Sequence, residues 1–211
     1  FNVSTSGIIN SSGDYTGELI FPSTAEIGGT NYTMHTTGYQ SFHSKSMSSV
    51  IIPDSYTQLT NRTFRNCQSL TSVTLGSGVI TDIATLAEFS FMDSTNLSAI
   101  NFSANNATYS SIDGVVFNKD TTQLLFCPIG KTGTYIVPNN VTSFRAYAFD
   151  QCAKLISITF EDTSTVTLLP DRLVQRCSNL ETFQIPSSVT ALGDNIFYGC
   201  PKLENVNVQT G

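Results

Sequence analysis

One pattern of spaced residues recurs along this chain and constrains its fold more than any other feature. The clearest copy is FDQCAKLISITF, residues 149–160, in which an aromatic residue, a cysteine, a leucine and two further apolar residues stand at fixed spacing. The other copies begin at Phe64, Phe91, Phe126, Val174 and Phe197. A damaged first copy keeps only Met47, Val50 and Ile52, with Phe42 one residue out of step. Such recurrence predicts a repeat architecture, in which each copy folds as one structural unit.

The end of each copy, L-x-x-I-x-F, predicts a short β-strand, because alternate residues of a strand face the same side. Successive copies begin 23 to 35 residues apart, which is too far for a hairpin sheet and suits a coil that lays each strand beside the previous one. A single turn cannot bury its own apolar side, so the turns must stack. Pro53, Pro138 and Pro186 follow strands and end them, since proline cannot donate to a ladder. We therefore predict a repeat solenoid of about six repeats with a parallel β-sheet, and short strands or helical turns on the return legs.

The step of 35 residues between Phe91 and Phe126 requires an insertion. Two apolar runs, IDGVVF and QLLF, flank NKDTT in this stretch, and Asn, Asp and Thr suit a chain reversal. We predict that residues 109–127 form a β-hairpin that projects from the coil.

The two ends of the chain fit the pattern less well. Residues 1–45 contain a predicted strand ending at Phe21 and a Gly28-Gly29 turn, and we expect them to form an N-terminal cap and a first partial repeat, followed by the solenoid over 46–211. The chain opens without a methionine or a signal pattern, so we expect any export signal or anchor to lie outside it. It stops just past a strand, which predicts either further repeats or an open last coil that can pair end to end.

Three stretches carry a resemblance to a known family: FDQCAKLISITF, LVQRCSNLETFQIPSSVTALGDNIF and FYGCPKLENVNV. They resemble the BspA-like leucine-rich repeats, over about residues 19–208 and including the insertion. Departures from the family pattern are local, with Ser94 and Ile129 in place of Cys, Val174 in place of Phe and Thr132 in place of Leu.

The resemblance implies a curved, right-handed coil with the parallel sheet on its concave face. It also implies a secreted or surface-attached microbial protein. Members of the family with assigned roles are adhesins that bind host or microbial surface proteins, including components of the extracellular matrix.

Four cysteines share one repeat position: Cys67, Cys152, Cys177 and Cys200. Neighbouring coils of a parallel ladder lie about 4.8 Å apart and their side chains point the same way, which keeps the Cβ atoms too far apart for a favourable disulfide. A line of thiols also cannot converge as the tetrahedron that zinc requires. We therefore predict buried free thiols that fill the core, with a Cys152–Cys177 or Cys177–Cys200 bridge as the alternative. Cys127 lies outside the shared position, and we predict that it is the most reactive thiol.

No group of residues points to catalysis, a cofactor or a metal. Neither G-x-S-x-G nor H-E-x-x-H is present, and GKTG at 130–133 lacks the first glycine of a phosphate-binding loop. His35 and His43 are the only histidines, and both lie in the predicted cap. Asp113 and Asp120 do not match the spacing of a calcium loop. We predict that the protein is not an enzyme and needs no cofactor.

The charge balance restricts the partners. The net charge is −6, whereas nucleic acids and anionic membranes attract clustered Lys and Arg. No apolar run approaches the roughly 20 residues of a membrane-spanning helix. Eight N-x-S/T sequons occur, which chance can explain in a chain rich in Asn, Ser and Thr, and which would carry glycans only in a host that exports and glycosylates the protein. They begin at Asn2, Asn10, Asn31, Asn61, Asn96, Asn101, Asn106 and Asn140.

The repeat itself creates the best candidate for a binding surface. In each strand, the residues before and between the last two apolar positions face away from the core, and the resemblance puts them on the concave face. Down the array they are Ser49 and Ile51, Ser72 and Thr74, Ala99 and Asn101, Thr134 and Ile136, Ser157 and Thr159, Thr182 and Gln184, and Asn205 and Asn207. One interpretation is a solvated sheet, and the other is an extended platform of neutral donors and acceptors for a protein or a glycan. A glycan on Asn101 would obstruct such a platform.

We predict an extracellular binding module, and the resemblance implies that it is an adhesin for a host or microbial protein. The alternatives are a glycan-binding module and a self-associating structural array. The ligand-binding residues expected on the concave face are Ile51, Ser72, Thr74, Asn101, Ser157, Thr159, Thr182, Gln184, Asn205 and Asn207. The hairpin residues Asn118, Lys119 and Asp120 are the second expected contact.

Overall fold

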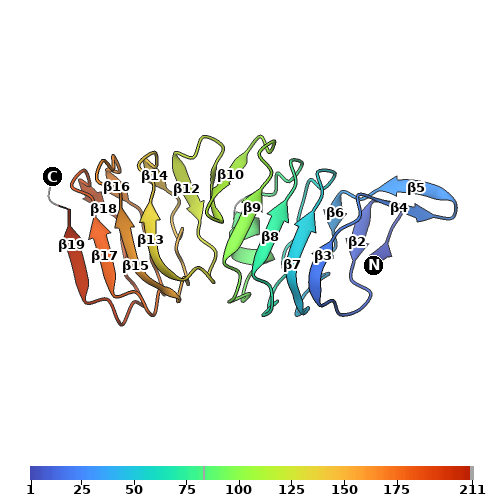
Figure 1. Ribbon diagram of the computed structural model, residues 1–211, viewed down its shortest axis with the longest axis horizontal. Coiled ribbons are helices and arrows are strands. Elements are labelled where there is room, and N and C mark those ends of the chain that lie inside the picture. Colours follow the sequence, from blue (N-terminus) through green and yellow to red (C-terminus); the bar gives the residue numbers. More distant parts are fainter. Residues whose placement is uncertain (83, 210–211) are drawn as a thin grey trace. The chain divides into compact units, whose positions relative to one another are not determined.

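The computed structural model describes residues 1–82 and 84–209, and the chain divides into two compact units, Phe1–Ser110 (unit 1) and Ser111–Gly211 (unit 2). Short β-strands make up most of the regular structure in both units (Figure 1). Each unit has its own ladder of strands and its own buried apolar residues.

In unit 1, four strands form a parallel ladder. They are β3 (Gly17–Ile20), β7 (Met47–Ile52), β8 (Ser72–Leu75) and β9 (Ala99–Phe102). Each strand pairs with the strand one coil further on, and the residues between them form the return leg. Burial alternates along β7 and β8 as the pattern L-x-x-I-x-F predicts, since every second side chain points into the unit.

Unit 2 repeats this arrangement with four further parallel strands. They are β13 (Gly133–Val137), β15 (Leu155–Phe160), β17 (Thr182–Ile185) and β19 (Asn205–Val208). The two ladders confirm the predicted β-solenoid built on a parallel sheet.

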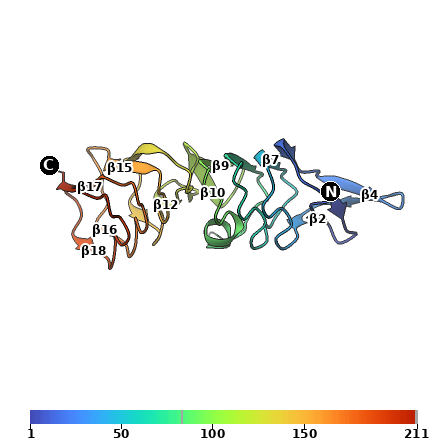
Figure 2. The same ribbon diagram turned by 90° about the horizontal axis from the view of Figure 1, so that it is seen from below.

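The return legs lie on the side of each unit away from its ladder (Figure 2). In unit 2 they carry two short strands that pair in parallel, β16 (Leu168–Leu169) and β18 (Ala191–Leu192). In unit 1, one return leg instead forms a helical turn, η1 (Thr85–Ser90). Both kinds of element predicted for the return legs are therefore present.

The N-terminal part of unit 1 adds three more short strands. β1 (Asn2–Val3) pairs antiparallel with β2 (Ile8–Asn10), and β2 pairs in parallel with β6 (Thr36–Thr37). An isolated bridge from Thr36 to Gln58 continues this row onto the next return leg. This end of the chain therefore joins the stack of return legs.

A hairpin follows β3 in unit 1. Its strands β4 (Thr24–Ile27) and β5 (Thr30–Thr33) are antiparallel, and the Gly28-Gly29 turn has φ of 58° and 80°, the left-handed values that a type I′ turn requires. The range 1–45, which we expected to form an N-terminal cap and a first partial repeat, supplies β3, the first ladder strand. β3 is the strand that the sequence predicts to end at Phe21, and its inward residues Leu19 and Phe21 are the only trace of the repeat pattern there.

The insertion in unit 2 follows β10 (Tyr109–Ile112), which spans the boundary between the units. β11 (Val115–Asn118) and β12 (Gln123–Phe126) pair antiparallel, which confirms the predicted hairpin, and β12 then pairs in parallel with β14 (Ser143–Phe144). The prediction that the hairpin projects is wrong, because most side chains of β11 and β12 are buried and Phe117 belongs to the core of unit 2. The runs VVF and LLF are apolar on both faces, so the hairpin must be covered.

A row of aromatic rings crosses the coils of unit 1. The ring centroids of Phe21 and Phe42 are 4.7 Å apart, those of Phe42 and Phe64 are 5.7 Å apart, and those of Phe64 and Phe91 are 5.7 Å apart. Rings at these separations attract each other beyond the burial of their surface. Phe42 therefore occupies the aromatic position of the first copy, although it stands one residue out of step in the sequence.

Asn106 is a buried polar residue that links two coils of unit 1. Its Nδ2 donates to Val79 O (2.8 Å), and its Oδ1 accepts from Thr108 N (2.9 Å) and Tyr109 N (2.8 Å). The side chain is fully buried, so this sequon cannot receive a glycan in the folded chain.

We predict that Asn106→Ala destabilises the protein by about 2–4 kcal/mol, because the carbonyl of Val79 and the N–H groups of Thr108 and Tyr109 lose their partner. Urea unfolding followed by circular dichroism measures the change. The control is Asn105→Ala, since Asn105 is exposed and should change stability by less than about 0.5 kcal/mol. Equal losses in the two variants would contradict the role assigned to Asn106.

Candidate functional site

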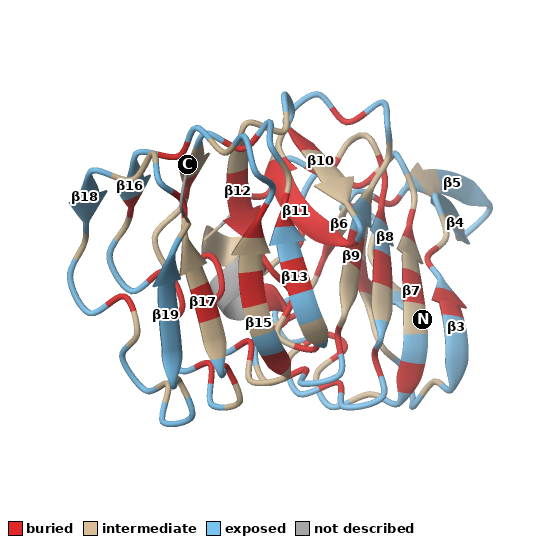
Figure 3. Ribbon diagram, turned by 60° about the vertical axis from the view of Figure 1, so that its left-hand side comes forward, coloured by how far each residue is buried: buried red, intermediate tan, exposed pale blue. Residues whose placement is uncertain are grey.

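The residues of each ladder that point away from the core form a surface that we call the ladder face. In unit 2, burial alternates along β13 and β15, whereas the last strand, β19, is exposed along its whole length (Figure 3). The ladder-face positions of all four strands are exposed or half-buried. In unit 1 the ladder face consists of Glu18, Ile20, Ser49, Ile51, Ser72, Thr74, Ala99 and Asn101. In unit 2 it consists of Thr134, Ile136, Ser157, Thr159, Thr182, Gln184, Asn205 and Asn207.

The strands pair in the register that the sequence predicts, which puts these residues in straight rows. Ser49 lies opposite Ser72, and Ile51 lies opposite Thr74. In unit 2, Thr182 lies opposite Asn205 in the same way. All ten residues predicted for the concave face therefore lie on the ladder face, although the two units hold them separately.

Sequence reasoning missed two residues of the ladder face. Glu18 lies opposite Ser49 and Ile20 lies opposite Ile51, because β3 is part of the ladder. The side chain of Ile20 is 58% exposed and makes an apolar patch with Ile51 at this end of the row. The signal that could have found them is Leu19 and Phe21, which alternate inward and precede a proline as in later repeats.

Most polar side chains of the ladder face form no hydrogen bond within the described part of the protein. Within the described part of the chain, no hydrogen bond is made by the side chains of Ser49, Ser72, Thr74, Asn101, Thr134, Ser157, Thr159, Thr182, Asn205 and Asn207. Hydroxyls elsewhere on the coils behave differently. Thr71 Oγ1 donates to Ser48 O (2.9 Å), and Thr190 Oγ1 donates to Thr167 O (3.3 Å). The ladder face therefore presents donors and acceptors that the fold itself does not use.

Gln184 is the exception on the ladder face. Its Oε1 accepts a hydrogen bond from Phe160 N (2.8 Å), where the pairing of β15 with β17 has stopped at Ile158 and Phe183. The amide thus stands in for a ladder hydrogen bond. Gln184 is therefore less available to a ligand than its neighbours.

The hairpin residues expected as a second contact have different roles. Asn118 closes the turn, since its Oδ1 accepts from Gln123 N (2.9 Å) and its Nδ2 donates to Thr122 Oγ1 (2.9 Å). Lys119 and Asp120 are exposed at the tip. Of the three expected residues, Lys119 and Asp120 are therefore the exposed ones, and Asn118 is half-buried.

The side chains at the shared cysteine position fill the core and also form hydrogen bonds between coils. Its residues donate to a carbonyl of the preceding coil: Cys67 Sγ to Phe42 O (3.1 Å), Cys152 Sγ to Cys127 O (3.4 Å), Cys177 Sγ to Phe149 O (3.0 Å) and Cys200 Sγ to Val174 O (2.9 Å). Ser94 makes the same bond through Oγ to Phe64 O (2.7 Å). Serine can replace cysteine here because it keeps this hydrogen bond, whereas Ile129, at the same position of the copy that begins at Phe126, has no donor.

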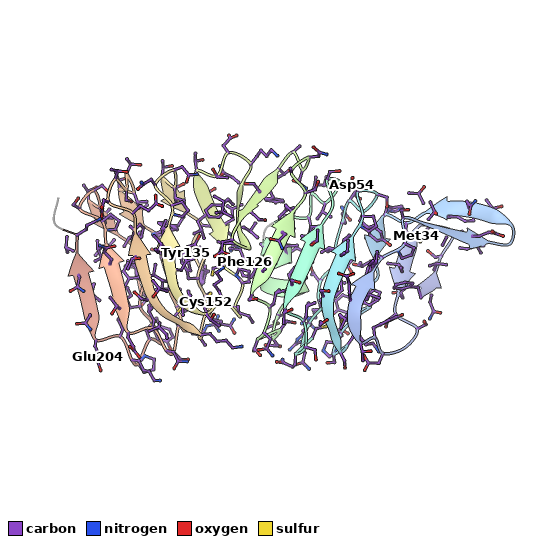
Figure 4. The ribbon with its side chains drawn as sticks, in the orientation of Figure 1. Met34, Asp54, Phe126, Tyr135, Cys152 and Glu204 are labelled. Carbon is purple, nitrogen blue, oxygen red and sulfur yellow. The ribbon has the colours of Figure 1, made fainter. Side chains whose placement is uncertain are left out.

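All five cysteines are free, and Cys152 lies in the interior of unit 2 (Figure 4). Burial raises the pKa of Cys67 to about 11 and also raises the pKa of Cys152, so both stay as unreactive thiols. The prediction that Cys127 is the most reactive is wrong, because its side chain is fully buried in the same core as Phe117 and Leu124 of the hairpin. Cys200 is half-buried and is the accessible thiol.

Residues 1–82 and 84–209 hold no cluster of three or more His, Cys, Asp or Glu side chains that could bind a metal ion. The described helical structure includes no segment with the length and apolarity needed to cross a bilayer.

Comparison with known families decides the classification. A family model described as BspA type leucine rich repeat region matches residues 35–127 and 122–211, with six copies. The chain belongs to this family. The resemblance seen in the repeat units is thereby confirmed, and BspA-type leucine-rich repeats are in general scaffolds for protein–protein interaction.

Solved structures share the fold of this BspA-type chain. A leucine-rich repeat protein from Eubacterium ventriosum ATCC 27560 is 20% identical with a TM-score of 0.55, over 99% of this chain and 69% of that one. A leucine-rich repeat protein from Bacteroides ovatus ATCC 8483 is 17% identical with a TM-score of 0.54, over 92% of this chain and 48% of that one, so this chain spans about half its length. The T. pallidum leucine-rich repeat protein is 20% identical with a TM-score of 0.50, over 89% of this chain and 78% of that one. No curated protein matches the sequence.

We predict that a thiol reagent labels the native BspA-type chain at Cys200 and leaves Cys67, Cys127, Cys152 and Cys177 unmodified until urea unfolds it. Burial shields the other four thiols, and at Cys67 and Cys152 it also disfavours the reactive thiolate. Peptide mass spectrometry after iodoacetamide treatment identifies the sites. The variant Cys200→Ser should remain unlabelled under native conditions, and native labelling at Cys127 would contradict the assignment.

Proposed function

We propose that this chain is a non-enzymatic binding module at the cell surface, and that it binds a partner protein through the ladder face as an adhesin. The observation that carries the proposal is the contrast between hydroxyls on the coils. Those of Thr71 and Thr190 bond to the preceding coil, whereas those of Ser72, Thr74 and Thr159 are left for a ligand. Membership of a family of interaction repeats supports the same function.

The chemistry of the ladder face suits a neutral polar partner. Its hydroxyl and amide groups can both donate and accept, and Glu18 is its one charged residue. Ile20 and Ile51 in unit 1 and Ile136 in unit 2 add apolar contact area. Such a surface favours a protein segment with its own unpaired backbone groups over a highly charged polymer.

We predict that Thr74→Lys combined with Thr159→Lys weakens binding to purified fibronectin, laminin or collagen at least about tenfold, because the long charged side chains cover the neutral rows in both units. Biolayer interferometry measures the dissociation constants. The control is Thr163→Lys, which adds the same charge at an exposed position between β15 and β16. Equal weakening by the control, or unchanged binding by the double variant, would contradict the assignment to the ladder face.

A further inference from the structure

The turns that precede the ladder strands form a second surface with a different composition from the ladder face. One of these turns in each unit carries two arginines, residues 61–66 (NRTFRN) in unit 1 and residues 171–176 (DRLVQR) in unit 2. We call these two turns the arginine turns. Of the five arginines in the chain, four lie here.

The backbone of each arginine turn is held rigidly. Arg62 and Arg172 have positive φ values of 60° and 53°, in the left-handed region. Phe64 N donates to Ser90 O (2.9 Å), and Arg172 N donates to Asp194 O (2.9 Å), so each turn is bonded to the following coil. The arginine side chains therefore project from fixed positions.

In each arginine turn, one of the two arginines is neutralised within the protein. Arg65 Nε lies 3.0 Å from Asp93 Oδ2 in unit 1. Arg176 Nε lies 2.9 Å from Asp150 Oδ1 in unit 2, and its Nη2 contacts Asp150 Oδ2. These ion pairs join neighbouring coils, so Arg65 and Arg176 have a role in the fold.

The other arginine of each turn is held by a tyrosine of the preceding coil. Arg62 Nη1 donates to Tyr39 OH (3.1 Å), and Arg172 Nη1 donates to Tyr147 OH (3.3 Å). The guanidinium carbon of Arg172 also lies 5.8 Å from the centroid of the Tyr147 ring. Neither Arg62 nor Arg172 forms an ion pair with any carboxylate among the described residues, although the chain has 16 acidic residues against ten basic ones.

This arrangement suits the binding of a carboxylate. A guanidinium has five N–H donors, and one of them is used to position it, which leaves donors for a bidentate contact with an oxyanion. The tyrosine ring beside it supplies apolar area, and Tyr39 is 61% exposed. Tyrosine and arginine are also among the residue types most enriched where binding energy is concentrated at protein interfaces.

We propose that the pairs Tyr39–Arg62 and Tyr147–Arg172 are two binding sites for acidic side chains of a partner protein, separate from the ladder face. Each site recognises one Asp or Glu carboxylate next to an apolar or aromatic residue that packs on the tyrosine. A sulfated polysaccharide fits less well, because it requires clustered cations, whereas Asp93 and Asp150 neutralise the second arginine of each turn and the net charge is −6.

The test selects peptides from a phage-displayed random dodecapeptide library on the intact chain. Selected peptides should carry Asp or Glu beside an apolar or aromatic residue. Replacing that acidic residue by its amide should weaken binding about tenfold, and Arg62→Ala with Arg172→Ala should do the same. The amide peptide should then lose nothing further on the double variant, because the two changes remove one contact.

Matched controls separate binding from folding. Arg65→Ala and Arg176→Ala remove the same charge from the same turns but break the ion pairs with Asp93 and Asp150, so they should lower stability and change peptide affinity by less than about twofold. Tyr39→Phe and Tyr147→Phe keep the ring and the arginine but remove the hydroxyl that positions it, so they should weaken binding less than loss of the arginine.

Three outcomes would overturn the proposal. One is a selected consensus without acidic residues, and another is unchanged peptide binding by the Arg62→Ala, Arg172→Ala variant. The third is heparin binding that the double variant loses while acidic peptides fail to bind, which would assign the sites to a sulfated glycan. The ladder-face variant Thr74→Lys, Thr159→Lys should still bind the acidic peptides, so failure of the proposed function and failure of this inference are distinguishable.

Discussion

The hydrogen bonds between one coil and the next are the interaction on which the rest of this protein depends. They act at two places, the parallel ladder and the turns before it, where Phe64 N bonds to Ser90 O and Phe149 N to Leu173 O. They hold adjacent coils near the strand spacing of about 4.8 Å. Each side chain therefore meets the same repeat position one coil before and one coil after it, and stability is a sum of contacts between neighbouring coils.

That fixed spacing decides what each row of side chains can do. Phenylalanine rings stack, as Phe42, Phe64 and Phe91 do. Thiols donate hydrogen bonds to carbonyls of the preceding coil, and they cannot turn toward each other to form disulfides. On the ladder face, the spacing only aligns side chains that the fold leaves unbonded. On the arginine turns, it brings an arginine of one coil to a tyrosine of the coil before, and this pairing between coils creates a group that no single repeat contains.

Several features were predictable because they follow from local pattern. The inward and outward alternation of the strands, their register and the antiparallel insertion all come from spacing and turn residues. Other features were not predictable. The burial of Cys127 depends on what covers it, and the amide of Gln184 accepts a hydrogen bond from a backbone N–H of another strand. Phe42 was out of step in the sequence, yet its ring lies in the stack, although the segment from Phe42 to Val50 is one residue shorter than the segment from Phe64 to Val73.

The sequence by itself determined the architecture, because a repeated pattern of inward apolar residues can be buried only by stacking, and it determined which residues lie on the ladder face, because strand residues alternate between two sides. Only the tertiary structure decided which polar groups remain free. Hydrogen bonds between coils use the hydroxyl of Thr71 and leave that of Thr74 unbonded, although the two residues are three apart in one repeat. The same holds for the arginines. Asp93 forms an ion pair with Arg65, and Tyr39 accepts a hydrogen bond from Arg62, although both partners lie on other coils, more than 20 residues away in the sequence.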